Sequence, residues 1–117
     1  MSGMRSYRAG LAAEEQVERH YARAGLQICA RRWRGSRGEI DLVARNGAEV
    51  IFIEVKSSRS HDLAALHLTP AQMRRICGTA TEFLAGEPNG QLTAMRIDLV
   101  LVDASGRIEV IENAITA

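Results

Sequence analysis

The chain has 117 residues, of which 46% are hydrophobic and 25% charged, and its formal net charge is +1 at pH 7. This length fits one domain, which we expect to span residues 1–117 and to bury a core without disulfide bonds. No N-terminal segment resembles a signal peptide, and no apolar run reaches the roughly 18 residues of a membrane span. The sequence therefore predicts a cytoplasmic protein without membrane contact. The small net charge neither favours nor excludes nucleic acid.

Cysteine and histidine positions argue against a disulfide framework and against a zinc site. Cys29 and Cys77 lie far apart in segments with apolar periodicity, which favours buried, reduced thiols. The three histidines, His20, His61 and His67, lack the spacings that are typical of zinc ligands.

The first half of the chain predicts one helix and a β-hairpin. Residues 10–24 have the periodicity of an amphipathic helix that Gly25 ends, and 26–30 is a short strand candidate. Two β-prone runs, 38–45 and 48–57, flank Asn46-Gly47, the strongest short hairpin signal.

The second half predicts a loop, a second helix and two more strands. Segment 58–68 is polar and indicates an irregular loop. Thr69 and Pro70 supply an N-cap and a first-turn proline for a helix that runs to about Ala85, and 86–90 is a turn. Strands near 95–103 and 107–113 close the chain. This order predicts an α/β layer with a mixed sheet.

A two-residue turn at Asn46 and Gly47 would fix the hairpin register. The predicted partners are Arg45 with Ala48, Asp41 with Phe52, and Glu39 with Glu54. Alternation then assigns one face to Glu39, Asp41, Glu54 and Lys56, and the opposite, buried face to Ile40, Leu42, Ile51, Ile53 and Val55. Asp41 and Glu54 become diagonal neighbours, about 7–8 Å apart at Cα.

Carboxylates this close repel one another unless a cation lies between them. Mg²⁺ or Mn²⁺ would remove the conflict, because hard cations favour carboxylate oxygens and keep several waters. Such an ion activates water and stabilises charge on a phosphoryl oxygen. Lys56, the only lysine in the chain, would then lie beside that water or the scissile phosphate. The alternative is an exposed strand face that is charged because water contacts it. Val43 and Phe52 lie on the same face and argue against this alternative, because they are apolar.

Two further features add candidate residues. Glu14 lies at the edge of the first helix's apolar stripe, so its carboxylate either reaches solvent or points at the site. A basic cluster with one aromatic residue suits phosphate contact and base stacking, with a solvated basic loop as the alternative. The residues of this cluster, with one later arginine, are Arg31, Arg32, Trp33, Arg34, Arg37 and Arg59.

Asp41 followed by Glu54-Val55-Lys56 resembles the PD-(D/E)XK nuclease signature. The surrounding sequence is more specific, because it resembles the YraN family of uncharacterised bacterial proteins. The segments that carry this resemblance are 14–15, 30–33, 38–43, 52–57, 96–98 and 113–114. The resemblance covers about residues 8 to 115. That family is similar in turn to archaeal Holliday-junction resolvases, which also carry a glutamate on the first helix.

The resemblance implies a restriction-endonuclease-like αβββαβ core with a central mixed sheet. It implies Asp41 and Glu54 as metal ligands, Lys56 as the catalytic lysine and Glu14 as an outer acidic ligand. Glu39 is a secondary candidate. So is Gln72, which stands where the family usually has a lysine. The chain also departs from the family pattern at Ala13, usually glycine, and at Arg32, usually asparagine.

The leading interpretation is a DNA endonuclease dependent on Mg²⁺ or Mn²⁺, with branched and single-stranded DNA as candidate substrates. The alternative is a nucleic-acid-binding or DNA-processing accessory module with little activity alone. A homodimer is one candidate assembly, because paired cuts need two sites, and DNA-processing proteins are further candidate partners. A two-carboxylate glycosidase is disfavoured because it needs a large sugar cleft and leaves Lys56 without a role.

Overall fold

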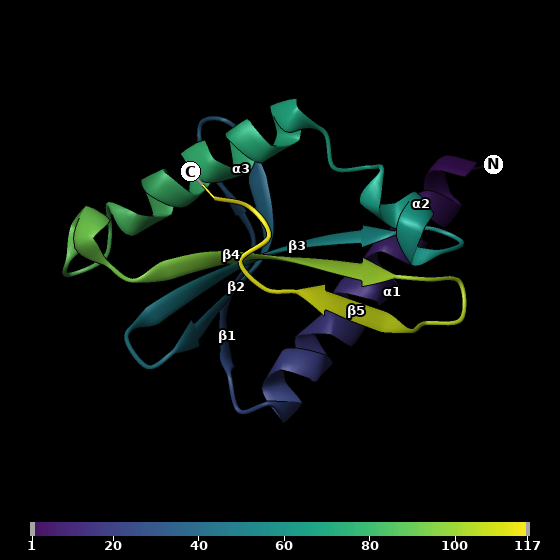
Figure 1. Cartoon of the computed structure of the whole chain (residues 1–117), viewed down its shortest axis with the longest axis horizontal. Coiled ribbons are helices and arrows are strands. Elements are labelled where there is room, and N and C mark those ends of the chain that lie inside the picture. Colours follow the sequence, from purple (N-terminus) through teal and green to yellow (C-terminus); the bar gives the residue numbers. More distant parts are fainter. Residues whose placement is uncertain (1, 117) are drawn as a thin grey trace.

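A computed structural model describes the backbone of residues 2–116 and the side chains from residue 10 to 116. Its elements, in chain order, are α1 (Ser2–Arg23), β1 (Gln27–Arg34), β2 (Glu39–Asn46), β3 (Glu49–Ser57), α2 (His61–Ala65), α3 (Pro70–Leu84), the 3₁₀ helix η1 (Gly90–Leu92), β4 (Met95–Val102) and β5 (Ile108–Ile111). Figure 1 shows this arrangement. The predicted α/β class and the αβββαβ order are confirmed, and the strand predicted near 107–113 is β5.

The five strands form one mixed sheet in the order β1-β2-β3-β4-β5. β1, β2 and β3 are antiparallel neighbours, β3 and β4 are parallel, and β5 returns antiparallel to β4. Parallel neighbours need a long connection, and the segment with α2 and α3 supplies it. The antiparallel β2–β3 hairpin therefore lies at the centre of the sheet, against the parallel strand β4.

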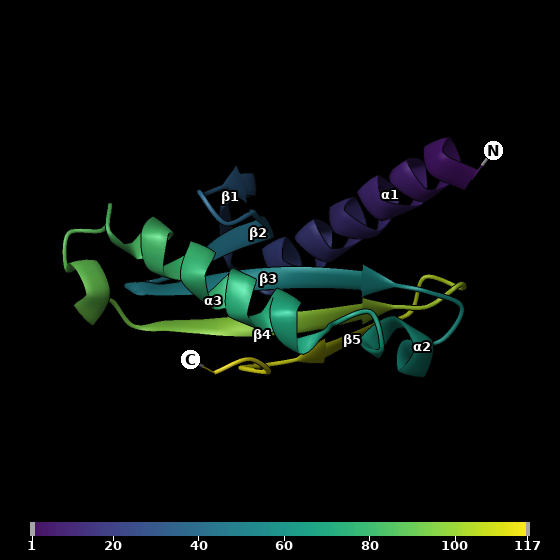
Figure 2. The same ribbon diagram turned by 90° about the horizontal axis from the view of Figure 1, so that it is seen from above.

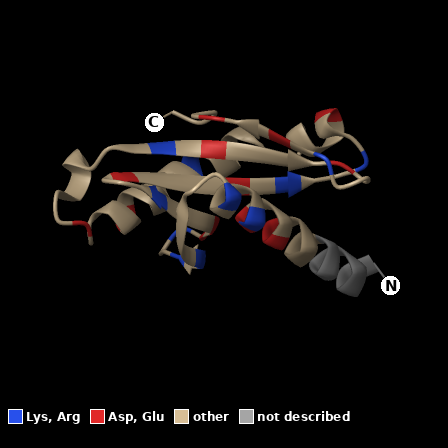
Figure 3. Ribbon diagram, turned by 90° about the horizontal axis from the view of Figure 1, so that it is seen from below, with Lys and Arg blue, Asp and Glu red and all other residues tan. Residues whose placement is uncertain are grey.

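The helices cover opposite faces of this sheet because neighbouring strand residues point to opposite sides. α1 packs on one face through Ala13, Val17 and Tyr21, against Leu42, Ala44, Ile51, Ile53, Val100 and Val102. α3 packs on the other through Ile76, Ala80 and Leu84, against Ile40, Val43, Val50, Phe52 and Ile97. α3 covers the sheet in the view of Figure 2, and α1 covers it in the opposite view of Figure 3. No helix within residues 2–116 has both the length and the apolar character of a membrane span.

Several predicted boundaries differ from the structure. α1 begins at Ser2 rather than near residue 10, since Gly10 is tolerated inside the helix. β1 continues to Arg34 instead of ending at Ala30, because Ala30 and Trp33 pack under α3. The segment 58–68 contains α2, whose N-cap Ser60 accepts the backbone N–H of Leu63.

The predicted hairpin register is wrong by two residues. Asn46 pairs with Glu49 and Arg45 with Val50, so the two turn residues are Gly47 and Ala48. Gly47 has φ +61°, and this fits a type II′ turn, in which glycine alone takes the first central position. The predicted pairs of Arg45 with Ala48, Asp41 with Phe52 and Glu39 with Glu54 are therefore absent, and Glu39 pairs with Arg34.

Two burial predictions also fail. Ile40 packs under α3 and not on the α1 face with Leu42. Alternation is broken at the intervening Asp41. The β1–β2 ladder pairs Arg31 with Leu42 and Trp33 with Ile40 but skips Asp41 and Arg32, and Arg32 has a left-handed backbone with φ +47°. Cys29 is exposed, because the β1–β2 ladder shifts register between Ile28 and Ala30 and leaves it unpaired.

Candidate active site

The two central carboxylates meet where β2 and β3 separate. The ladder ends at the pair Leu42–Ile53, and one further step of this register sets Asp41 opposite Glu54. Asp41 Oδ2 accepts the backbone N–H of Val55 at 2.8 Å. A side chain of β2 thus takes the place of a strand-to-strand hydrogen bond. In this register the two acids lie directly opposite one another, not diagonally as predicted from the sequence.

Lys56 lies beside these carboxylates on the same strand as Glu54. Its Nζ is 3.2 Å from Glu54 Oε2, and the side chains of both residues are largely shielded from solvent. The other carboxylate oxygen, Glu54 Oε1, is buried and has no hydrogen-bond partner in residues 10–116. A buried oxygen without a donor is costly, so this position calls for a proton or a cation.

The pKa values of Asp41 and Glu54 are both raised. Burial raises the pKa of Glu54, and the neighbouring Asp41 raises it further, to about 8, although Lys56 opposes the shift. Burial also raises the pKa of Asp41, against the hydrogen bond from Val55 and the charge of Lys56. One lysine therefore does not compensate two carboxylates in a site this enclosed.

The chemistry of this donor set fits a hard divalent cation. Mg²⁺ is commonly held by one or two carboxylates and keeps several waters. Glu54 Oε1 could bind such an ion, because no donor within residues 10–116 forms a hydrogen bond to it. Across residues 10–116, however, no group of three His, Cys, Asp or Glu side chains is arranged to hold a metal ion. The structure brings together Asp41 and Glu54, and it does not add Glu14 as a third ready ligand.

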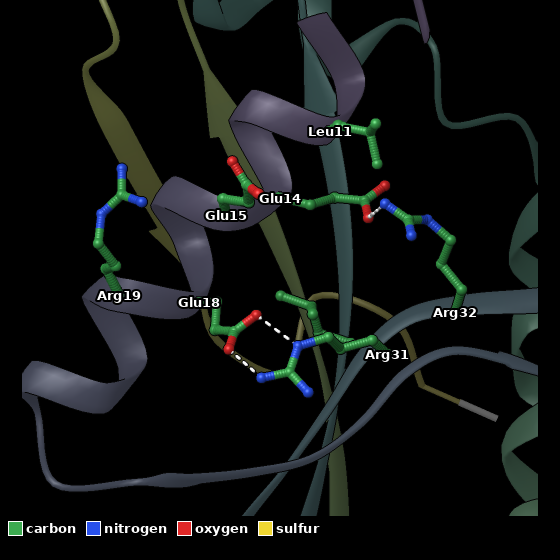
Figure 4. A pocket seen from close by; sticks show the side chains of 8 residues that line it. Leu11, Glu14, Glu15, Glu18, Arg19, Arg31 and Arg32 are labelled. Atoms are coloured by element: carbon green, nitrogen blue, oxygen red, sulfur yellow. Dashed lines mark hydrogen bonds and ion pairs between the residues drawn. The ribbon is translucent and has the colours of Figure 1, made fainter. Parts of the chain in front are cut away.

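Glu14 faces the site but is held by an arginine. Its Oε1 lies 2.9 Å from Arg32 Nη2. Burial, and then the charge of Asp41, raise the pKa of Glu14, while Arg32 lowers it. Figure 4 shows the ion pair at a hollow of about 450 Å³ between α1 and β1. Glu14 is therefore close enough to sense Asp41, and its role as a ligand stays a prediction.

Three arginines of the basic cluster are neutralised by glutamates. Besides the Arg32–Glu14 pair, Arg31 Nε donates to Glu18 Oε1 at 2.8 Å and Arg34 Nη2 to Glu39 Oε2 at 2.7 Å. Blue and red segments are mixed along the described part of α1 in Figure 3. These arginines could contact phosphate only after leaving their partners.

The other residues of the predicted nucleic-acid set lie in different settings. Trp33 packs edge-on against Phe83 with ring centroids 5.2 Å apart, so its ring belongs to the core under α3. Arg37 and Arg59 are exposed, and no carboxylate of residues 10–116 pairs with them.

Gln72 closes the first turn of α3. Thr69 Oγ1 accepts the Gln72 N–H at 3.1 Å, and Gln72 Oε1 accepts the Thr69 N–H at 3.3 Å. The two residues form a capping box, which satisfies backbone donors that have no partner within the helix. The structure thus gives Gln72 a structural task.

Replacing Gln72 by alanine is expected to lower the free energy of unfolding by about 0.5–1 kcal/mol, because one arm of the capping box is lost. Urea unfolding followed by circular dichroism measures this loss. Mn²⁺ affinity, read from the metal-induced shift in Tm, should be unchanged. Gln27→Ala, at an exposed position of β1, is the control. A tenfold fall in Mn²⁺ affinity would instead place Gln72 in the metal site.

Asp98 is a buried acid to which the sequence assigned no role. It is fully buried on β4, in register with Ile53, and its oxygens accept from Tyr21 Oη, Arg96 Nε and the backbone N–H of Asn113. Its signal was an aspartate inside the apolar run of residues 95–102. By linking α1, β4 and the C-terminal segment, Asp98 supports the strand beside β3.

Comparison with known proteins gives one consistent result. Residues 13–102 match the model described as "Uncharacterised protein family UPF0102". The chain is 65% identical, over the whole of both chains, to a UPF0102 protein of Cereibacter sphaeroides strain ATCC 17025. It is 55% identical to one from Ruegeria pomeroyi, over 96% of this chain and 91% of that protein. A Dinoroseobacter shibae relative is 47% identical, over 95% and 83%.

Proposed function

The chain belongs to the uncharacterised protein family UPF0102, and from the geometry of its site we propose a divalent-metal-dependent endonuclease that hydrolyses phosphodiester bonds in DNA. One observation carries the proposal. Glu54 is buried with a free oxygen beside a second carboxylate, that of the half-buried Asp41, and beside Lys56. Such a group is unfavourable for stability alone and suits cation-assisted chemistry.

Each residue of the site has a distinct task in this proposal. Asp41 and Glu54 would hold Mg²⁺ or Mn²⁺, which supplies activation of a water and neutralisation of phosphoryl charge. The Val55 N–H fixes the Asp41 carboxylate at 2.8 Å and so sets its direction. Lys56 keeps a cationic Nζ near Glu54, where it donates hydrogen bonds to a phosphoryl oxygen as charge develops there.

The sequence resemblance adds support to this assignment. Asp41, Glu54 and Lys56 occupy the positions of the PD-(D/E)XK signature, and the wider text resembles the YraN family and, through it, archaeal Holliday-junction resolvases. We therefore propose branched or single-stranded DNA as substrate and a homodimer as assembly. The exposed thiol of Cys29 suits a reducing compartment such as the cytoplasm.

A second candidate function is a nucleic-acid-binding accessory module with little activity alone. The observation in its favour is that residues 10–116 offer no ready set of three metal ligands, with Glu14 paired to Arg32. The two candidates differ in a measurable way. The endonuclease cleaves DNA when Mg²⁺ or Mn²⁺ is added, whereas the module only binds it.

Incubation of the purified protein with a four-way junction and with single-stranded DNA, in Mg²⁺ or Mn²⁺, tests the proposal. We expect cleavage by the wild type and none above background by Asp41→Asn or Lys56→Ala, since each removes a group that acts on the phosphate or its metal. Asp62→Asn, an exposed acid on α2, is the control and should cleave normally. Activity that survives both site substitutions would point to another site or a contaminant. Binding without cleavage would favour the accessory module.

A further inference from the structure

We propose that Arg37, Arg74 and Arg75 form a surface that binds the backbone of a nucleic-acid single strand, here named the α3 arginine surface. The ligand class rests on the proposed function. The three side chains are exposed, and no carboxylate of residues 10–116 lies within 4.0 Å of their guanidinium groups. Only Arg37 among them belongs to the basic cluster predicted from sequence.

The β1–β2 loop is fixed on α3, and this fixes Arg37. Ser36 donates to the Glu82 carboxylate through its backbone N–H, at 2.9 Å, and through its hydroxyl, at 2.7 Å. Arg37 crosses the helix at Gly78, where a Cβ atom would lie 2.8 Å from Arg37 Cδ. Because Gly78 lacks that atom, the arginine can lie directly against the helix backbone. The conformational entropy lost on binding is correspondingly smaller.

Arg75 makes the reciprocal contact from helix to loop. Its Cδ would lie 3.0 Å from a Cβ at Gly38, which has φ +150°. Gly38 is three residues before Asp41, so Arg75 connects the arginine surface to the strand that carries the site. Glu54 and Lys56 share the α3 side of β3 with Phe52, since residues two apart point the same way. A strand held by these arginines lies on the same side as Lys56.

A hollow beside these arginines indicates that the ligand is a single strand and not a duplex. It measures about 540 Å³ between α3 and the C-terminal segment, with Arg37 and Arg74 among its lining residues. Its apolar lining comes from Met73, Cys77 and Ile115. Two cations with an apolar floor suit a phosphate and the flat face of an unpaired base. A paired and stacked base could not enter such a hollow, so the geometry favours a single strand.

The binding test compares two matched double variants. Arg74→Gln/Arg75→Gln removes two charges from α3. The control, Arg19→Gln/Arg23→Gln, removes two exposed charges from α1 that form no ion pair with a carboxylate of residues 10–116. Anisotropy of a labelled single-stranded oligonucleotide is measured in EDTA, where metal-dependent cleavage cannot occur. We expect about tenfold weaker binding by the α3 variant, with a salt slope lower by roughly 1–2, and a change under about twofold for the α1 variant.

A third variant separates position from charge. Gly78→Ala keeps every arginine but forces Arg37 off the helix, and we expect about threefold weaker binding, while the alanine favours the helix. Circular dichroism checks that all variants are folded. Equal losses in the two double variants, unchanged binding by the α3 variant, or duplex bound as tightly as single strand would each overturn the proposal. Binding is read in EDTA and cleavage in Mg²⁺, so a wild type that binds through these arginines without cleaving contradicts the proposed activity alone, and cleavage that does not need them contradicts this surface alone.

Discussion

Replacing Asp98 by alanine is expected to remove roughly 3–5 kcal/mol from the free energy of unfolding, because it leaves several buried donors without their common acceptor. The carboxylate is fully buried and accepts from Tyr21 Oη at 2.8 Å, and from Arg96 Nε and the Asn113 N–H at 3.0 Å each. Without it, the Tyr21 hydroxyl and the guanidinium of Arg96 lose partners in a place that water does not reach freely.

Urea unfolding, followed by circular dichroism at constant pH, measures the effect of Asp98→Ala. Tyr21→Phe removes a single donor and should cost about 1 kcal/mol, since the ring remains packed under the sheet. Asp98→Asn keeps an acceptor but loses the charge, so its stability should lie between those of Tyr21→Phe and Asp98→Ala. A loss below about 1 kcal/mol for Asp98→Ala would show that the network adds little to stability.

Local signals were enough to predict the order of elements. Thr69 and Pro70 begin α3 as expected, with Gln72 completing the cap, because these residues act on the backbone a few positions away. The apolar stripe of α1 was also readable, since Ala13, Val17 and Tyr21 are buried together, although Ala24, its predicted fourth member, lies beyond the helix and is exposed. These features depend on neighbours in sequence, and the sequence contains those neighbours.

The hairpin register could not be derived in the same way. Asn46-Gly47 is compatible with two turns, one with both residues at its centre and one with Gly47 and Ala48 there. The second occurs, and it moves every partner by two residues. A shift of two preserves the face of Glu54 and Lys56, and Asp41 still reaches them through its hydrogen bond from the Val55 N–H, although alternation is broken there. That these side chains lie near one another was predictable, whereas the position of Asp41 directly opposite Glu54 was not.

The sequence could not indicate which arginines are free to contact nucleic acid, because long-range ion pairs decide this. Arg31 and Arg32 pair with Glu18 and Glu14 of α1, and no pattern within the basic cluster could identify those partners. Gly78, by contrast, allows a contact only because Arg37 happens to cross it. A cluster of like charges in sequence is therefore a poor guide to which charges remain available in the fold.

In EDTA, the free energy of unfolding should fall by on the order of 3 kcal/mol between pH 5 and pH 8.5. Glu54 has a pKa raised to about 8 in the folded chain, against 4.5 ordinarily, through burial and the charge of Asp41. Between these values the folded state binds more protons than the unfolded state, so stability is lost as pH rises. The raised pKa of Asp41 acts in the same direction.

Other acids change stability in a separate pH window. Ion pairing lowers the pKa of Glu18 and of Glu87, and hydrogen bonds from backbone N–H groups lower that of Asp103. The stability they contribute is lost only as the solution becomes more acidic than their ordinary range. The decline toward alkaline pH therefore comes from the acids whose pKa is raised: Glu54 and Asp41, with Glu14 acting in the same direction.

Glu54→Gln should show how much of the loss of stability toward alkaline pH comes from the titration of Glu54. It replaces the titrating group by a neutral one of similar shape, so the variant should be less sensitive to pH and more stable than the wild type at pH 8.5, but not at pH 5. Mn²⁺ should stabilise the wild type most at pH 8.5, because it replaces the lost proton, and should leave Glu54→Gln nearly unaffected. Urea unfolding at five pH values, with EDTA or Mn²⁺, makes both comparisons. A wild type whose stability is constant from pH 5 to pH 8.5 in EDTA would mean that the two acids are better compensated than their burial indicates.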